Sequence, residues 1–237
     1  MDWTGYILCW CVAFLCGSIP FAVLIGRAKG VDIRKVGSGN PGATNLGRAI
    51  GKKWGLLCFG LDVGKGLVPV LGFGLWLGAM TVLDQLAFSG GASGVFSGVI
   101  SGTVWAWQWV GLAIAAVIGH MFSPWLGFKG GKGAATGLGA SLGLFPFVTV
   151  PGVICGLVWV VVAKATGYVG LSSCLAAALL PVLTAVSGLV MGLALPPLMV
   201  FVSLTALLAA LVIVRHRGNL QRLVKGTEPK AAWTGKA

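Results

Sequence analysis

Long apolar runs alternate with short polar stretches along most of the chain. The runs lie at 4–26, 54–80, 104–123, 134–147, 148–164, 169–190 and 197–214. A run of about 20 apolar residues is typical of a helix that crosses a membrane. Helices suit the bilayer because they satisfy their own backbone hydrogen bonds. The pattern therefore predicts an all-α membrane protein.

The polar or mixed stretches between these runs lie at 27–53, 84–103, 124–133 and 215–237. The first is dense in charge and glycine, and the second is rich in Gly and Ser with Asp84 as its one charged residue. Neither is long enough for a separate soluble domain. We expect one integral membrane domain over residues 1–237, with 215–237 as a basic tail.

One boundary needs a decision, because 134–164 is a single apolar run of about 30 residues, too long for an untilted span. Pro146 and Pro151 lie in its middle, where a turn would fall. With a turn there, every Lys and Arg except Lys65 lies on one side of the membrane, as the positive-inside rule favours. We therefore predict about seven transmembrane helices, with the N-terminus outside and the C-terminus and the polar motif loops on the cytoplasmic face.

Composition supports this reading. Hydrophobic residues make up 57% of the 237-residue chain and charged residues only 9%, against about 25% charged in soluble domains. This excludes a soluble enzyme, a disordered chain and a nucleic-acid-binding module, so we expect no nucleic-acid partner despite the net charge of +12. The six Cys lie in apolar runs, and no cluster of His or carboxylates has metal-ligand spacing. We expect neither a metal nor a cofactor.

The first candidate site is a glycine-rich stretch in the first polar loop. Its glycines would let backbone N–H groups converge on an anion, and its arginine could bind phosphate through two hydrogen bonds. Asn40 would cap a short helix, with Pro41 in its first turn. The alternative is a flexible linker. The candidate residues are Gly37, Ser38, Gly39, Asn40, Thr44, Asn45 and Arg48.

The second candidate opens the run that begins at residue 134. Free N–H groups at a helix start bind anions, and two lysines flank the glycines. The stretch is not a Walker A loop, because Gly133 stands where that motif needs Ser or Thr. A basic membrane-flanking turn is the alternative. The candidate residues are Lys129, Gly130, Gly131, Lys132, Gly133 and Thr136.

The third candidate follows the last apolar run. Its histidine could act as an acid, a base or a phosphate donor, although such a stretch alone is more often a stop-transfer flank. The candidate residues are His216, Arg217, Asn219 and Glu228.

Three further polar residues lie inside apolar runs. Asp62 and Lys65, three positions apart in the second run, would form a buried ion pair that supports or contributes to a site. His120 has either a structural or a catalytic role.

Together these motifs, in this order, resemble the bacterial acyl-phosphate:glycerol-3-phosphate acyltransferase family. The resemblance covers about Gly17 to Lys230. It implies seven spans in the bacterial inner membrane, with the active site facing the cytoplasm. It also implies transfer of an acyl group from acyl phosphate to the 1-hydroxyl of glycerol 3-phosphate, giving lysophosphatidic acid and phosphate for phospholipid synthesis. The partners would be acyl phosphate, glycerol 3-phosphate and membrane lipids; no oligomeric state is predicted.

The resemblance also implies roles for individual residues. Ser38 and Arg48 match its essential Ser and Arg, and the polar residues of its third motif fall on His216, Asn219 and Glu228. Its glycerol-phosphate glycines fall on Gly130, Gly131 and Gly133, with Lys129 and Lys132 beside them. We expect the catalytic residues to be Ser38, Arg48, Lys132, His216 and Asn219. The general base is either His216 or an oxygen of a substrate phosphate. The stretch 84–103 is longer than is usual in the family, and Pro41 stands where the family often has Ile or Val. A transporter of a phosphorylated metabolite is the alternative function, since spans, an ion pair and anion sites would also suit it.

Overall fold

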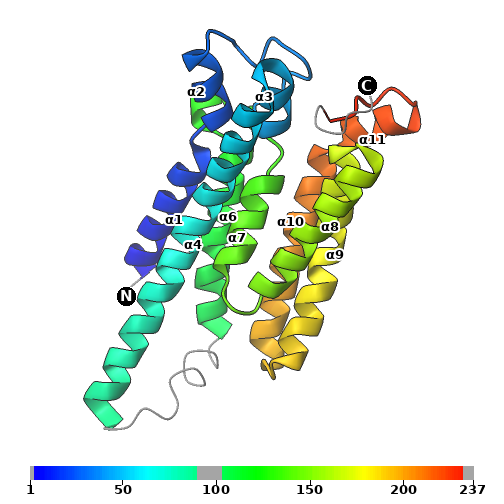
Figure 1. The fold of residues 1–237 in the computed structure, drawn as a ribbon. Coiled ribbons are helices and arrows are strands. Elements are labelled where there is room, and N and C mark those ends of the chain that lie inside the picture. Colours follow the sequence, from blue (N-terminus) through cyan, green and yellow to red (C-terminus); the bar gives the residue numbers. More distant parts are fainter. Residues whose placement is uncertain (1–2, 90–102, 232–237) are drawn as a thin grey trace.

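The computed structural model of the chain describes residues 3–89 and 103–231, which form helices joined by short connections (Figure 1). In chain order these are α1 (Trp3–Ser18), α2 (Phe21–Ala28), α3 (Ala43–Ile50), α4 (Lys52–Ser89), α6 (Thr103–Met121), the 3-10 turn η1 (Pro124–Leu126), α7 (Ala134–Gly143), α8 (Thr149–Thr166), α9 (Val169–Val190), α10 (Leu195–Arg215) and α11 (Arg217–Val224). The predicted Gly/Ser-rich stretch begins within α4, and most of it lies outside the described residues.

Six helical segments of the described chain are long and apolar enough to cross a membrane. The first comprises α1 and α2, and the others are α8, α9, α10 and the apolar parts of α4 and α6. The prediction of an all-helical membrane fold is therefore confirmed. The run predicted as the fourth span is the exception, because α7 has 10 residues and is only about 15 Å long.

The chain reverses between α7 and α8, as the two prolines predicted. Pro146 lies in the turn, and Pro151 lies in the first turn of α8, where its missing N–H breaks no helical bond. One continuous helix through 134–164 is excluded. Residues 169–190 form a helix with the predicted bounds.

The first apolar run is divided by a break that the hydrophobic pattern did not indicate. Pro20 has no N–H, and α1 ends just before it. The carbonyl groups freed at the break find side-chain partners. Lys65 Nζ donates to the Ile19 carbonyl at 2.7 Å, and Ser123 Oγ donates to the Ser18 carbonyl at 2.7 Å. A helix can break at membrane depth when such partners replace the lost bonds.

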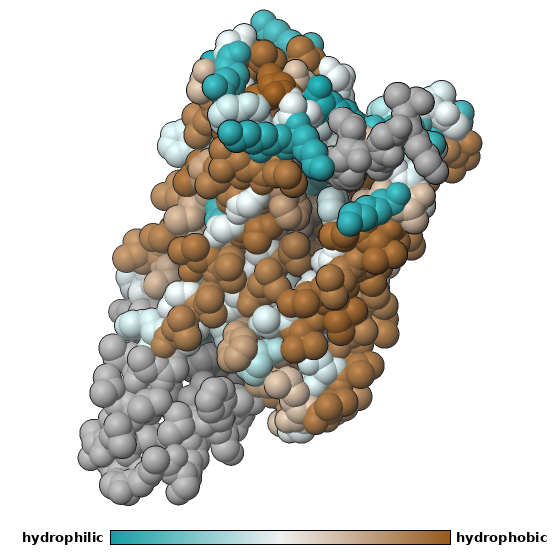
Figure 2. Space-filling view, viewed as in Figure 1, coloured by the Kyte–Doolittle hydropathy of each residue, from teal (hydrophilic) through white to brown (hydrophobic). Residues whose placement is uncertain are grey.

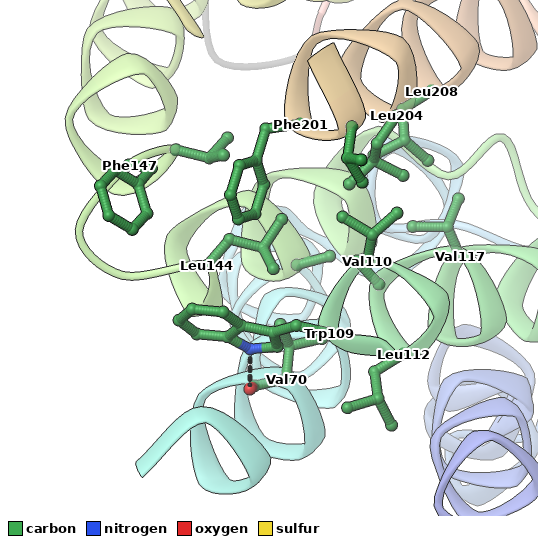
Figure 3. Packing of buried hydrophobic residues seen from close by; sticks show 14 of the residues in the cluster. Val70, Trp109, Val110, Leu112, Val117, Leu144, Phe147, Phe201, Leu204 and Leu208 are labelled. Carbon is green, nitrogen blue, oxygen red and sulfur yellow. Dashed lines mark hydrogen bonds between the residues drawn. The ribbon is translucent and has the colours of Figure 1, made fainter. Parts of the chain in front are cut away.

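The main apolar core lies where α4, α6, α7 and α10 meet (Figure 3). Trp109 donates from its indole to the Val70 carbonyl at 2.8 Å and packs edge-on against Phe201. Between α4 and α7, a Cβ at Gly66 or Gly139 would meet backbone oxygen at 2.2 or 2.0 Å. Small residues at these points let the helix backbones touch, which fixes the start of α7 against α4.

Polar residues gather at one end of the molecule, here called the basic end. Figure 2 shows hydrophilic surface there and apolar surface along the described helices below it. In Figure 1 the same end carries α2, α3 and α11, while α1 begins toward the opposite end. The three motif stretches all lie at or just below the basic end, so the fold brings them together.

Candidate active site

A cavity of about 440 Å³ extends inward from the basic end between α3, α4 and α7 to α10. Its outer part is lined by polar side chains from all three motif stretches. Its inner part is lined by apolar side chains of α7, α8, α9 and α10. The site therefore combines a charged compartment with an apolar one.

The first glycine-rich loop is held by Asn45, whose side chain is buried. Asn45 Oδ1 accepts from the Ser38 N–H at 3.0 Å, and Asn45 Nδ2 donates to the carbonyls of Ile33 (2.8 Å) and Val36 (3.1 Å). Gly37 has φ +57° and lies so close that a Cβ would meet Asn45 Oδ1 at 2.4 Å. Asn45 is thus fully used in shaping the loop and presenting Ser38.

Part of the backbone of this loop is used inside the protein. The N–H groups of Ser38, Gly39 and Gly42 bond to Asn45 Oδ1, the Val36 carbonyl and the Asn40 carbonyl. In the first turn of α3, the N–H groups of Ala43, Thr44 and Asn45 have no partner among the residues described. Gly42, rather than Asn40, is the N-cap. Such N–H groups at a helix start can bind an anion, and the anion site in this loop stays a prediction.

Arg48 lies one turn further along α3 and lines the cavity. Its Nη2 donates to the carbonyls of Pro229 (2.9 Å) and Lys230 (3.3 Å). Its Nε is buried and has no partner in the described part of the molecule. Burial lowers the pKa of Arg48 below its usual value, but a guanidinium remains charged at any physiological pH. Arg48 thus supplies a fixed positive charge and an unused donor.

The second loop is held by the end of α6. The N–H groups of Gly130 and Gly131 donate to the carbonyls of Met121 and His120, both at 3.1 Å. Arg215 of α10 donates to the carbonyls of Gly130 and Gly131 at 2.8 Å. These glycines are therefore needed for packing: a Cβ at Gly130 would meet the His120 carbonyl oxygen at 2.1 Å. The amides of both glycines are already occupied, and their place in a glycerol-phosphate site stays a prediction.

N–H groups without a partner in the described chain come immediately after these glycines. Gly133 caps α7 with φ +81°, and the N–H groups of Ala134 and Ala135 have no partner within the described chain. Both residues line the cavity beside Lys132. Burial, with the nearby Arg222 next in effect, lowers the pKa of Lys132 to about 8. The start of α7 is thus a second cationic helix N-terminus facing the same cavity.

The third stretch forms a polar bridge to Lys132. Lys132 Nζ donates to Asn219 Oδ1. Asn219 Nδ2 donates to Glu228 Oε1 at 2.6 Å, and Arg222 Nε donates to Glu228 Oε2 at 2.8 Å. Gly170 permits this arrangement, because a Cβ there would meet Asn219 at 2.6 Å. The bridge fixes Lys132 and brings the segment after α11 over the site.

His216, between α10 and α11, is buried and lines the cavity. Its Nδ1 lies 2.8 Å from the Val212 carbonyl. A carbonyl only accepts, so Nδ1 carries the proton and Nε2 carries the lone pair. Burial lowers the pKa of His216 to about 4, and the charge of Lys132 also contributes. The imidazole is therefore neutral at pH 7 and offers Nε2 as an acceptor.

Below the charged compartment, Asp62 and Lys65 form the expected ion pair at 2.8 Å, with both side chains buried. Asp62 lines the cavity, whereas Lys65 turns away to the Ile19 carbonyl. His120 Nδ1 lies 3.8 Å from Asp62 Oδ1. The other ring nitrogen of His120 lies against the second loop, because a Cβ at Gly131 would meet His120 Nε2 at 2.2 Å. This network connects the break between α1 and α2, together with α4 and α6, to the loop that carries Lys132.

Most of the residues that the sequence indicated for a site line this one cavity. They are Ser38, Asn40, Thr44, Asn45, Arg48, Asp62, His120, Lys132, Gly133, His216, Asn219 and Glu228. Those that do not line it are Gly37, Gly39, Lys65, Lys129, Gly130, Gly131, Thr136 and Arg217. Lys129 and Arg217 are exposed, and the buried Thr136 hydroxyl has no partner in the described chain.

Sequence reasoning did not assign the roles of Arg215 and Arg222. Their positions after the last apolar run suggested only a basic flank, because their partners, Gly131 and Glu228, are recognised as such only in the fold. Among the described residues, no group of three or more His, Cys, Asp and Glu could hold a metal ion.

Residues 7–226 match the model of a family described as glycerol-3-phosphate acyltransferase. A relative of that name from Geobacter sulfurreducens is 38% identical over 92% of this chain and 93% of its own. A Synechococcus relative with the same name is 38% identical over 95% of each chain.

The fold is also similar to solved structures of PlsY (YgiH), described as an integral membrane glycerol 3-phosphate acyltransferase. The glycerol 3-phosphate form matches with a TM-score of 0.71 and 34% identity over 95% of each chain. The lysophosphatidic acid form matches with a TM-score of 0.69. The chain therefore belongs to the glycerol-3-phosphate acyltransferase family, whose members are enzymes of the membrane.

Proposed function

We propose that this enzyme transfers an acyl group from acyl phosphate to the 1-hydroxyl of glycerol 3-phosphate, giving lysophosphatidic acid and inorganic phosphate. The observation that supports this most strongly is the composition of the cavity. Two cationic helix N-termini, at α3 and α7, share it with an apolar compartment between α7 and α10. This arrangement suits two phosphates and one acyl chain.

Each phosphate has its own binding site in this proposal, here called its seat. The first seat, with Arg48 and the N–H groups of Ala43 and Thr44, holds the phosphate of the donor. The second seat, with Lys132 and the start of α7, holds glycerol 3-phosphate. The relatives' name and the glycerol 3-phosphate form of the similar structure support this acceptor. Both seats open on one cavity, so the hydroxyl and the acyl carbon can meet without a covalent enzyme intermediate.

In the transfer step, the 1-hydroxyl oxygen of glycerol 3-phosphate attacks the acyl carbonyl carbon. A new C–O bond forms, the bond from that carbon to the phosphate oxygen breaks, and phosphate leaves. The oxyanion that develops on the acyl oxygen would be stabilised by donors at the cavity mouth, namely the Ser38 hydroxyl and Lys132. Phosphate is a good leaving group, so no strong acid is needed.

His216 orients the attacking hydroxyl through Nε2 in this proposal, and a phosphate oxygen of glycerol 3-phosphate receives the proton. The pKa of His216, lowered to about 4 by burial, makes the ring a weak proton acceptor beside Lys132. The phosphate monoester of glycerol 3-phosphate, with a second pKa of about 6, is the stronger base. The rate should therefore fall on the acid side near pH 6; an acid limb near pH 4 would instead make His216 the base.

We further propose that α7 is a short seventh membrane segment, in an inner membrane orientation with the basic end toward the cytoplasm. The α7–α8 hairpin begins and ends toward the basic end. The direction in which α9 and α10 cross the membrane therefore does not depend on how deep α7 reaches. The positive-inside rule favours the cytoplasm for the end that carries Arg34, Lys53 and Lys129.

A transporter of a phosphorylated metabolite is the alternative function, and the apolar lining of the inner cavity argues against it. A transport path needs polar groups along its length and access from both sides. Here the inner compartment is walled by apolar side chains such as Leu138, Leu180 and Leu208. Such walls suit the chain of a lipid and would hinder a small phosphorylated metabolite.

The test measures phosphate and lysophosphatidic acid produced by the purified protein from palmitoyl phosphate, with and without glycerol 3-phosphate, and with palmitoyl-CoA in parallel. We expect release that depends on both acyl phosphate and glycerol 3-phosphate, with equal amounts of the two products. Lys132→Ala should lose this activity, and Lys164→Ala, at the exposed end of α8, should retain it. Release without the acceptor, or activity with palmitoyl-CoA alone, would contradict the proposal.

A further inference from the structure

A short segment that follows α11 lies at the mouth of the cavity and is here called the strap (residues 228–231). After α11 the chain turns back toward α3 at the basic end (Figure 1). Glu228 at the start of the strap and Ala231 at its end are buried, whereas Pro229 and Lys230 between them are exposed. The strap is therefore buried at both ends and open to solvent in its middle.

Each end of the strap is held by a different part of the fold. The Glu228 carboxylate accepts from Asn219 at 2.6 Å and from Arg222 at 2.8 Å. The Ala231 N–H donates to the Gly167 carbonyl at 2.8 Å, in the turn between α8 and α9. Ala231 is only 3% exposed, and a buried N–H that loses its partner is costly. The strap is thus pinned between α11 and the α8–α9 turn.

The middle of the strap contacts Arg48 of α3. Arg48 Nη2 donates to the carbonyls of Pro229 at 2.9 Å and Lys230 at 3.3 Å. Proline fixes its own φ and restricts the residue before it, so Pro229 limits the shapes that the strap can adopt. The pinned strap therefore holds the two carbonyls in place for Arg48 and connects α3 to the α8–α9 turn.

These bonds leave much of the Arg48 guanidinium available to a ligand. A guanidinium carries N–H donors on three nitrogens in one plane, and both carbonyls lie at one of them, Nη2. Arg48 Nε is buried and has no partner in the described part of the chain. The strap therefore restricts the directions in which the guanidinium can point without using all of its donors.

Resting on the proposed function, we propose that the strap is a positioning element that holds Arg48 ready for the phosphate of acyl phosphate. Without the strap, Arg48 would have to be ordered each time the donor binds, and ordering a long side chain weakens binding. The second seat would keep its geometry, because Lys132 bonds to Asn219 and Asn219 bonds to Glu228, and neither bond involves Ala231. Loss of the bond at Ala231 should therefore affect the two substrates unequally.

The experiment compares KM for palmitoyl phosphate with KM for glycerol 3-phosphate in variants of Ala231. Ala231→Pro removes the N–H that donates to the Gly167 carbonyl. We expect it to raise KM for palmitoyl phosphate about two- to tenfold, as the ordering of one long side chain predicts, and to change KM for glycerol 3-phosphate less than about twofold. Ala231→Gly is the conservative variant, which keeps the N–H and should match the wild type in both KM values.

A second pair of variants tests the strap from the α8–α9 turn and decides the question if Ala231→Pro does not fold. Gly167 has φ +80°, and a Cβ there would lie 3.1 to 3.3 Å from carbons of the Lys230 side chain. Gly192 has φ +70°, and an added Cβ would have nothing within 4 Å. Gly167→Ala should raise KM for palmitoyl phosphate selectively, by a smaller factor than Ala231→Pro. Gly192→Ala carries similar backbone strain away from the strap and should not.

Three results with an active wild-type enzyme would overturn this inference alone. Equal changes of both KM values in Ala231→Pro would indicate a general structural role, and a lower KM for palmitoyl phosphate would indicate a strap that competes for Arg48. The same KM for palmitoyl phosphate in Gly167→Ala and Gly192→Ala would show that the strap does not act on this substrate. No turnover of palmitoyl phosphate by the wild-type enzyme would overturn the proposed function, and this inference with it.

Discussion

The two glycine-rich loops at the basic end look alike in sequence but are held in different ways. The first is shaped from within, by the Asn45 side chain of the helix that it introduces. The second is fixed from outside, by the last carbonyls of α6 and by Arg215 of α10. In both cases two glycine amides bond within the protein, those of Gly39 and Gly42 and those of Gly130 and Gly131, and N–H groups without a partner in the described chain lie in the first helical turn that follows.

This difference separates local from long-range stabilisation of an anion site. The first loop depends on contacts within about one dozen residues, whereas the second depends on helices far apart in the chain. Glycine in these motifs therefore indicates close backbone packing as much as direct anion binding. Variants of the two loops should differ in how strongly they disturb the rest of the protein.

The largest effect is expected in the second loop. In Gly130→Ala the new Cβ would lie 2.1 Å from the His120 carbonyl oxygen, so the loop must move and Lys132 with it. A displacement of about 1 Å can cost about 100-fold in rate. Gly127→Ala, with φ +58° but open space around the Cβ, is the control and carries only backbone strain. Acyl-transfer rates equal in the two variants would contradict the packing role of Gly130.

The first loop should lose both stability and activity when its central side chain is removed. Asn45→Ala removes three hydrogen bonds inside the protein, and we expect a loss of about 2–3 kcal/mol in unfolding free energy with a clear drop in kcat. Asn45→Asp keeps an acceptor for the Ser38 N–H but cannot donate to Ile33 and Val36, so it should also be impaired. Thermal unfolding in detergent and initial rates measure both effects, and full activity of Asn45→Ala would refute this role.

The ion pair beneath the second loop gives the next prediction. Asp62→Asn leaves Lys65 buried without its carboxylate, which costs about 3–5 kcal/mol. The double variant Asp62→Leu with Lys65→Met should recover much of this stability and remain several-fold less active. Asp32→Asn, which removes an exposed 2.9 Å pair with Arg34, is the control and should change neither. A double variant with wild-type rates would show that the pair serves folding alone.

The smallest expected effect distinguishes the two seats by pH. The pKa of Lys132 is lowered to about 8, so this lysine is charged below pH 8 and loses its charge above it, while Arg48 stays charged. KM for glycerol 3-phosphate should therefore rise several-fold between pH 7 and pH 9, with KM for acyl phosphate nearly constant. Lys132→Arg should remove that rise, and a parallel rise of both KM values would contradict separate seats.

The sequence predicted the helices well because each long apolar run has one stable solution in a membrane, as residues 169–190 illustrate. It also predicted the α7–α8 turn from Pro146. It did not reveal the break at Pro20, since the freed carbonyls there are satisfied by Lys65 and Ser123 from other helices. A hydrophobic pattern carries no information about such partners.

The side chains of the site could be predicted from the sequence, but the state of its backbone could not. Residue types at helix starts indicated phosphate binding, and Ser38, Arg48, Lys132, His216 and Asn219 all line one cavity. Which backbone amides remain free was not predictable. Their availability depends on contacts such as Arg215 with Gly131, between residues of different helices.

In the proposed reaction, acyl phosphate and glycerol 3-phosphate bind together in one cavity and react directly. Initial rates of phosphate release, measured while acyl phosphate and glycerol 3-phosphate are both varied, test it most directly. Simultaneous seats require a ternary complex, so double-reciprocal plots should intersect. Parallel lines would indicate that phosphate leaves before the acceptor binds, through an acyl-enzyme, and would contradict the two-seat account.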